Sequence, residues 1–283
     1  MKTRVAINGF GRIGRMSFRI LAERKDIEVV GINDLTDTLT LAHLLKHDTN
    51  YGEFQHQVTF DATSIIVDGV SIPVSAEKDP EQLPWKTLEV DVVIESTGRF
   101  VTTETASAHL RAGAKKVVLS APAKDEETPT IVIGANEEAL EQAGDVISNA
   151  SCTTNSIAAV MAIMELEFGI EKAMLTTVHS YTATQVLQDG PSKDLREARA
   201  AAQNLVPTTT GAAKAVALTV PSLKNKFDGL SVRVPTSVVS LSDVTMVLKK
   251  DTTKEEINEV FKKHVKEPYF QGIIAVSEEP LVS

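Results

Sequence analysis

A glycine-rich segment near the N-terminus constrains the fold of this chain more than any other feature. Gly9, Gly11 and Gly14 form the pattern G-x-G-x-x-G, which follows an apolar β-branched run at 5–7 and opens an amphipathic stretch at 13–23. Glycines at this spacing allow a tight turn and close approach of the backbone to a pyrophosphate at a helix N-terminus. Glycine-rich turns are common, so the pattern alone leaves dinucleotide binding as one of two interpretations, the other being an ordinary turn.

An acidic residue after the second predicted strand strengthens the dinucleotide interpretation. Asp34 follows the run at 29–32 and lies about 20 residues beyond Gly14, where a carboxylate can accept both ribose hydroxyls and repel a 2′-phosphate. This favours NAD over NADP, although a strand-end turn residue is the alternative. Thr97 and Ser120 also follow predicted strands, where ligands of open α/β sheets collect.

The order of predicted elements indicates an α/β protein with two domains. In residues 1–150 short β-branched runs alternate with amphipathic stretches, which predicts a parallel sheet wound by helices. Between 58 and 84 the rhythm changes to short strands with a hairpin signal at Asp68-Gly69, which we interpret as an insertion. Residues 151–283 mix strands and helices, so a Rossmann-like domain followed by a mixed α+β domain is expected.

Composition excludes several classes of function. A net charge of −9 disfavours nucleic-acid binding, and the apolar runs are too short to span a membrane. The single cysteine cannot form an internal disulfide or a cysteine-rich metal site, which suits the cytoplasm. His43 and His47 share a helical spacing but lack the glutamate and third ligand of a zinc site, so we predict no metal.

That single cysteine occupies a position that favours chemistry. Cys152 stands among small polar residues before a stretch with helical spacing, and Ser151 and Thr153 suit a cap or first turn. A helix N-terminus favours the thiolate. A buried, inert cysteine is the alternative on this residue alone.

Two further groups of residues are candidates for a site. His179 ends a predicted strand at 173–178, and either catalysis or a hydrogen-bonded core position explains it. Thr210 and Gly211 open a small-residue helix and Arg233 lies in a later strand, so hydroxyls, free N–H groups and a guanidinium could hold an anion. A helix cap and a surface arginine are the alternatives.

Taken together, the motifs resemble those of phosphorylating glyceraldehyde-3-phosphate dehydrogenases along the whole chain. The resemblance rests on the segments at 8–15, 148–155, 179–185, 199–204, 207–214 and 233–236. It implies a nucleophilic Cys152 that attacks an aldehyde, with His179 as acid and base. Hydride then passes to NAD, and inorganic phosphate releases the thioester as an acyl phosphate, so that glyceraldehyde 3-phosphate becomes 1,3-bisphosphoglycerate in glycolysis. A homotetramer is also implied.

The resemblance assigns the binding residues as well. It implies that Thr182 and Arg233 hold the substrate phosphate. The attacking phosphate is assigned to Ser151, Thr153, Thr210 and Gly211, with Arg196 as an additional contributor. The cofactor contacts implied are Arg12 and Ile13 at the pyrophosphate, Asp34 at the ribose, and Lys78, Thr97 and Ser120 around the groove. Gly190-Pro191 also matches the NAD-using form of the family.

The C-terminal end departs from the family pattern. Family members continue past the strand that we predict at 273–276, and supply there an asparagine to the nicotinamide and a terminal helix that returns to the cofactor domain. We therefore expect a C-terminally incomplete chain that binds NAD weakly and turns over poorly, because apolar surface would be exposed. A non-catalytic NAD-binding or interaction module, or an erythrose-4-phosphate dehydrogenase, remains an alternative.

Overall fold

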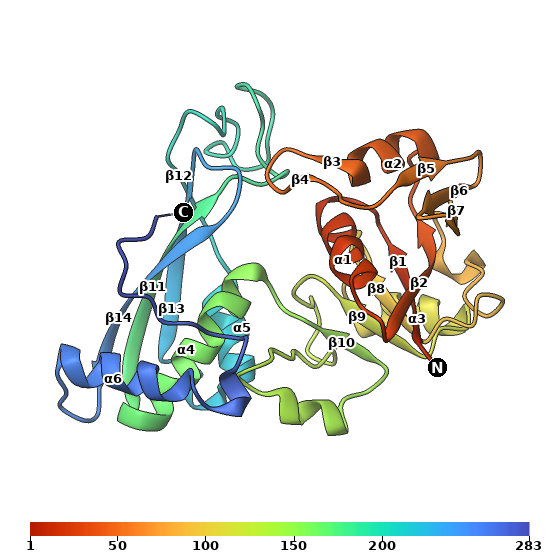
Figure 1. Ribbon diagram of the computed structural model, residues 1–283. Coiled ribbons are helices and arrows are strands. Elements are labelled where there is room, and N and C mark those ends of the chain that lie inside the picture. The colour runs from red at the N-terminus through yellow and green to blue at the C-terminus, as the bar shows by residue number, and fades with distance from the viewer. Residues whose placement is uncertain (283) are drawn as a thin grey trace. The chain divides into compact units, whose positions relative to one another are not determined.

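The computed structural model describes residues 1–282 and divides into two units (Figure 1). The first unit comprises Met1–Thr130 and Leu140–Ala150, and the second comprises Ile131–Ala139 and the chain from Ser151 onward. Residues 131–139, which we predict as part of the first domain, pack with the second unit.

An eight-stranded sheet forms the first unit, in the order β10-β9-β8-β1-β2-β7-β6-β5. Its strands are β1 (Thr3–Asn8), β2 (Ile27–Asn33), β5 (Val58–Phe60), β6 (Ser64–Val67), β7 (Val70–Ser75), β8 (Val92–Glu95), β9 (Lys116–Leu119) and β10 (Val146–Ser148). The pairs from β10 to β7 are parallel, whereas β6 pairs antiparallel with both β7 and β5. The predicted Rossmann-like arrangement is confirmed.

The short strands between 58 and 84, which we interpret as an insertion, join the main sheet. Strand β7 pairs in parallel with β2, joining Ile32 to Val74 and Asn33 to Ser75, so the short strands extend the main sheet at one edge. The hairpin itself is confirmed, since Asp68 and Gly69 have φ values of 49° and 80°, which its tight turn requires.

Helices cover both faces of this sheet, and consecutive residues of β1 pack against helices on opposite faces. Ile7 packs in one apolar cluster with Phe18 of α1 (Arg12–Ala22) and Leu41 of α2 (Thr38–Lys46). Ala6 packs in another cluster with Ala106 of α3 (Thr103–Arg111). The buried central strands are therefore apolar on both faces, as parallel sheets require.

The second unit contains a four-stranded sheet in the order β12-β13-β11-β14. Its elements are α4 (Cys152–Phe168), β11 (Ile170–Ser180), β12 (Val206–Thr208), α5 (Ala212–Thr219), β13 (Phe227–Val234), β14 (Ser240–Leu248) and α6 (Lys254–His264). The remaining short elements of the chain are β3 (His47–Asp48), β4 (Gly52–Glu53) and the 3₁₀ turns Pro80–Gln82, Glu137–Gln142, Pro221–Leu223 and Pro268–Phe270. Strands β11 and β13 are parallel, whereas β14 and β12 pair antiparallel with them. The predicted mixed α+β domain is confirmed.

Helices α4 and α5 lie against one face of this sheet (Figure 1). The strand predicted at 273–276 is wrong: this segment is irregular, and Ile274 packs instead against Ala159 and Ile163 of α4. Burial of those side chains is achieved without strand pairing. Among residues 1–282, the helices are too short or too polar to cross a membrane.

The glycine-rich turn gives a stability prediction. A Cβ at Gly14 would overlap the carbonyl oxygen of Gly9, whereas a Cβ at Gly11 would meet open space. Gly14→Ala should therefore lower the free energy of unfolding by about 1–3 kcal/mol, because backbone must shift. Gly11→Ala is the matched control and should change it by less than about 0.5 kcal/mol. Denaturant titration of both variants checks this, and equal midpoints would contradict the packing described.

Candidate active site

The glycine-rich turn of the first unit leaves a cradle at the start of α1. Gly11 is the N-cap and offers no side-chain cap, so the first N–H groups of α1 remain available to an anion. The open space around Gly11 is what close approach of a pyrophosphate needs. Asp34 accepts hydrogen bonds from the N–H groups of Phe10, at 2.8 Å, and Thr36, at 3.0 Å, which fixes its carboxylate beside the turn. These residues fit a dinucleotide.

Other predicted cofactor residues lie at the ends of strands in the same unit. Ser120 follows β9, and its N–H donates to the carbonyl of Glu95, while Thr97 follows β8. Ile13 is exposed in the first turn of α1, and Lys78 is exposed in the loop after β7. The guanidinium of Arg12 forms an ion pair with Asp48 of β3.

Cys152 is the first residue of α4. Ser151 is the N-cap, and its hydroxyl accepts from the N–H of Thr154 at 3.1 Å, which starts the helix at the cysteine. Cys152 is exposed to solvent as a residue, although protein atoms partly surround its thiol. Its pKa is lowered, and the largest cause is the hydrogen bond to His179, which outweighs the opposing effect of desolvation. A helix N-terminus further favours the thiolate.

His179 reaches the cysteine from the carboxyl end of β11. Its Nε2 lies 3.3 Å from Cys152 Sγ, and its side chain is otherwise buried. The pKa of His179 is raised, first by the hydrogen bond to Cys152 and also by the carbonyl of Ser180, whereas burial and Arg233 lower it. A thiol whose pKa is lowered beside an imidazole whose pKa is raised is an arrangement suited to nucleophilic catalysis.

Arg233 and the carbonyl of Ser180 favour different proton states of His179. The carbonyl lies 2.7 Å from Nδ1 and accepts when Nδ1 carries a proton, as in the imidazolium. Arg233 Nη1 lies 2.6 Å from the same nitrogen and can donate only when Nδ1 is unprotonated. The register of parallel strands β11 and β13 sets His179 directly beside Arg233. The surroundings of His179 therefore support both its protonated form, which can act as an acid, and its neutral form, which can act as a base.

Among the other predicted phosphate residues, Thr153 contacts Cys152 and helps to lower the pKa of its thiol, whereas Thr182, Arg196 and Thr210 make contacts within their own segments. Thr182 bonds to Thr184, and Arg196 forms an ion pair with Asp194 at 2.9 Å. The hydroxyl of Thr210 accepts from the N–H of Ala212 at 3.1 Å, while Gly211 is the N-cap of α5 without a side-chain cap. Thr153 is buried in the first turn of α4 beside the cysteine. Within residues 1–282, no group of three or more potential ligands is arranged to hold a metal ion.

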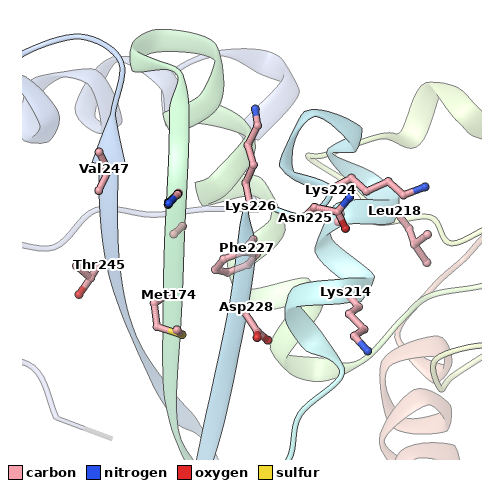
Figure 2. A pocket seen from close by; sticks show the side chains of 13 residues that line it. Met174, Lys214, Leu218, Lys224, Asn225, Lys226, Phe227, Asp228, Thr245 and Val247 are labelled. Carbon is pink, nitrogen blue, oxygen red and sulfur yellow. The ribbon is translucent and has the colours of Figure 1, made fainter.

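The second unit also contains a cavity of about 780 Å³, whose lining residues Figure 2 shows. Its lining does not include Cys152. It includes Ala173 of β11 and Phe227 of β13, which pair with each other, whereas His179 and Arg233 pair near the opposite ends of the same strands. The lysines at 172, 214, 224 and 226 line the cavity together with Ala173 and Phe227. The cavity is therefore not the site of the thiol chemistry.

Sequence reasoning missed a buried polar row behind the cradle. Asn8, Asn33 and Glu95 are the last residues of β1, β2 and β8, and all three side chains are buried. The sequence does carry a signal for these three residues, because each of them is a single polar residue between an apolar run and a candidate loop. The carbonyl of Ser180, by contrast, carries no sequence signal.

Comparison with known proteins identifies relatives of the whole chain. Residues 3–103 match the NAD binding domain of glyceraldehyde 3-phosphate dehydrogenase, and residues 151–283 match its C-terminal domain. The chain is 53% identical to glyceraldehyde-3-phosphate dehydrogenase of Geobacillus stearothermophilus over 100% of its length and 84% of that protein's. It is 58% identical to the Thermotoga maritima protein of the same name, over 99% of this chain and 84% of that one.

The thiol–imidazole pair gives a reactivity prediction. Because the pKa of Cys152 is lowered by His179, alkylation by iodoacetamide should rise with pH through a midpoint below the ordinary thiol range. His179→Asn should move that midpoint upward and slow alkylation at neutral pH by roughly an order of magnitude. His43→Asn, an exposed histidine on α2, is the control and should alkylate like the wild type. A pH profile unchanged by His179→Asn would contradict the pairing.

Proposed function

This chain belongs to the glyceraldehyde-3-phosphate dehydrogenase family, and from that membership we propose that it oxidises glyceraldehyde 3-phosphate with NAD and inorganic phosphate to 1,3-bisphosphoglycerate in glycolysis. The family is NAD-dependent, so NAD is the cofactor. The observation that carries the proposal for this chain is the 3.3 Å contact between Cys152 Sγ and His179 Nε2 at the start of α4. Residues 1–150 then serve as the NAD-binding domain and 151–283 as the catalytic domain.

The first step is nucleophilic attack by the thiolate of Cys152 on the aldehyde carbon. A bond forms between Sγ and that carbon, and the electron pair of the carbonyl moves to oxygen. His179 supplies a proton from Nε2 to this oxygen, since Nε2 faces the sulfur that attacks. The product is a hemithioacetal on Cys152.

Oxidation requires removal of that same proton. His179 accepts the hydroxyl proton at Nε2 while the carbonyl re-forms, and bound NAD supplies the acceptor for the departing hydride. Cys152 is left as a thioester. A phosphate oxygen then attacks the thioester carbon, the sulfur leaves as a thiolate stabilised by His179, and the acyl phosphate is released.

Two groups of residues are proposed to bind the phosphates. Arg233 and Thr182 hold the substrate phosphate, supported by a guanidinium Nε that is buried without a hydrogen-bond partner. The attacking phosphate is assigned to residues with hydroxyls and N–H groups at helix starts, with Arg196 as a further contributor: Ser151, Thr153, Thr210 and Gly211.

The cofactor residues are proposed to act mainly through the turn and the strand ends. Gly9, Gly11 and Gly14 admit the pyrophosphate, which the N–H groups of Arg12 and Ile13 contact. Asp34 accepts the ribose hydroxyls. Lys78, Thr97 and Ser120 line the same groove.

A homotetramer is proposed from the family membership, and an exposed apolar face of the second unit's sheet offers a surface for one of its subunit contacts. Met174, Leu230 and Leu241 are 52%, 47% and 62% exposed, and strand register sets Thr176 beside Leu230 and Val178 beside Leu241. Exposed apolar surface of this kind marks a subunit contact. A catalytic thiol without a pairing cysteine also suits a reducing compartment, which supports the cytoplasm.

The proposed activity predicts phosphate-dependent formation of NADH from glyceraldehyde 3-phosphate. Cys152→Ser should lower kcat/KM by about a thousandfold or more, because the nucleophile is lost. Ser156→Ala, one turn further along α4, is the control and should retain near wild-type turnover. The assay follows NADH absorbance with and without phosphate, and with erythrose 4-phosphate as a competing substrate. Equal rates without phosphate would reject the proposal.

The proposed assembly predicts that charge on the exposed sheet face breaks it. Leu241→Lys should shift the sedimentation coefficient toward a smaller species, because a buried ammonium without a partner opposes association. Lys254→Glu, in the first turn of helix α6, which packs against α4, serves as the control and should leave the species distribution unchanged. Sedimentation velocity distinguishes the two, and an unchanged Leu241→Lys profile would exclude this face from the contact.

A further inference from the structure

Three adjacent parallel strands of the first unit end in buried polar residues. Asn33, Asn8 and Glu95 close β2, β1 and β8, and the strand register sets Asn8 beside both of the others. Their exposures are 5%, 1% and 1%. Buried polar groups at these levels must be hydrogen-bonded to be tolerated.

Hydrogen bonds join these side chains into one row. Asn33 Nδ2 donates to Asn8 Oδ1 at 2.7 Å, and Asn8 Nδ2 donates to Glu95 Oε2 at 2.5 Å. Asn33 also exchanges two hydrogen bonds with the backbone of Glu77, which fixes the orientation of its amide. The row therefore runs in one direction, with Glu95 as its final acceptor.

Each member stands directly before a loop of the proposed cofactor site. Gly9 follows Asn8, Asp34 follows Asn33, and Ser96-Thr97 follow Glu95. Glu95 Oε1 accepts from both the N–H, at 2.8 Å, and the hydroxyl of Thr97. Ser96 ties this loop to the glycine turn, since its hydroxyl donates to the carbonyl of Gly9 at 2.8 Å.

The only tryptophan of the chain fixes the proton at the far side of the row. Trp85 Nε1 lies 2.9 Å from His109 Nδ1, and an indole only donates, so Nδ1 must be an acceptor. The single ring proton of His109 is then on Nε2, which lies 3.0 Å from Glu95 Oε2. Both rings are fully buried. Glu95 consequently receives four hydrogen bonds, from Asn8, His109 and twice from Thr97.

We propose that Glu95 is a positioning residue for NAD binding, and that the buried row from Trp85 through His109 and Glu95 to Asn8 and Asn33 holds the three cofactor loops in their binding geometry. The inference rests on the proposed function of this unit. A loop held in place before the ligand arrives loses less entropy on binding, which raises affinity. If one donor of the network has no acceptor, the loops are held less firmly and this gain in NAD affinity is lost.

Glu95→Gln tests this with almost no change of volume. The glutamine carbonyl can still accept from Thr97, but its NH₂ then faces the donors of Asn8 and His109. His109 cannot move its proton to Nδ1 while Trp85 donates there. We expect NAD affinity, measured by calorimetry, to fall about tenfold, with the KM for NAD rising and kcat within about threefold of wild type. Glu28→Gln, an exposed carboxylate of β2, is the matched control.

A double variant separates positioning from loss of structure. Trp85→Phe removes the indole N–H that donates to His109 Nδ1. When it is combined with Glu95→Gln, the His109 ring proton can move to Nδ1, and Nε2 can then accept a hydrogen bond from the new glutamine amide. The double variant should therefore bind NAD more tightly than Glu95→Gln alone, about threefold, whereas independent structural losses would make it weaker. A double variant equal to or weaker than Glu95→Gln, or a Glu95→Gln with wild-type affinity, overturns the proposal.

Wild-type measurements keep the proposal testable if the variants do not fold. ¹⁵N spectra of the histidine rings should place the His109 proton on Nε2, and a proton on Nδ1 would overturn the direction of the row. Cys152 alkylation reports the integrity of the second unit independently. Failure of the wild type to bind NAD would count against the proposed function itself, whereas unchanged affinity in Glu95→Gln would count only against the positioning role.

Discussion

Parallel pairing of strands is the constraint on which both candidate sites depend. In a parallel pair both strands run toward the same edge of the sheet, so the residues at their carboxyl ends become neighbours whatever their separation in sequence. In the first unit this sets Asn8 beside Asn33 and Glu95. In the second unit it sets His179 beside Arg233, although 54 positions separate them. In each unit, polar side chains from different strands are thus brought together at the carboxyl ends of the parallel strands.

The two edges use their polar groups for different purposes. In the buried row from Trp85 to Asn33 the side chains are joined by matched donors and acceptors, which gives a rigid base for the cofactor loops. Around His179 the groups conflict, because Arg233 and the carbonyl of Ser180 both address Nδ1 with opposite requirements. A satisfied network stabilises one geometry, whereas a group with two comparable proton states can both donate and accept during a reaction.

Local patterns predicted most elements because they depend on neighbours in sequence. The alternation of apolar runs and amphipathic stretches predicted β1, α1, β2 and α3, and Asp68-Gly69 predicted its hairpin. The sequence did not predict that the strands at 58–75 join the main sheet, since the pairing of β7 with β2 leaves no periodic signal. The strand predicted at 273–276 is wrong because an irregular segment that packs against α4 needs apolar residues just as a buried strand does.

What the sequence alone determined is the chemistry available: a lone cysteine at a helix start, a glycine turn before a helix, an acid after the second strand, and motifs specific enough to identify a family. Only the tertiary structure decided which of these groups act together. In the tertiary structure His179 Nε2 contacts Cys152, and Arg12 pairs with Asp48. It also shows that Glu95, a strand residue, accepts the hydrogen bonds from the Thr97 loop. The reason is that hydrogen bonds between distant residues follow from strand register, which no local pattern encodes.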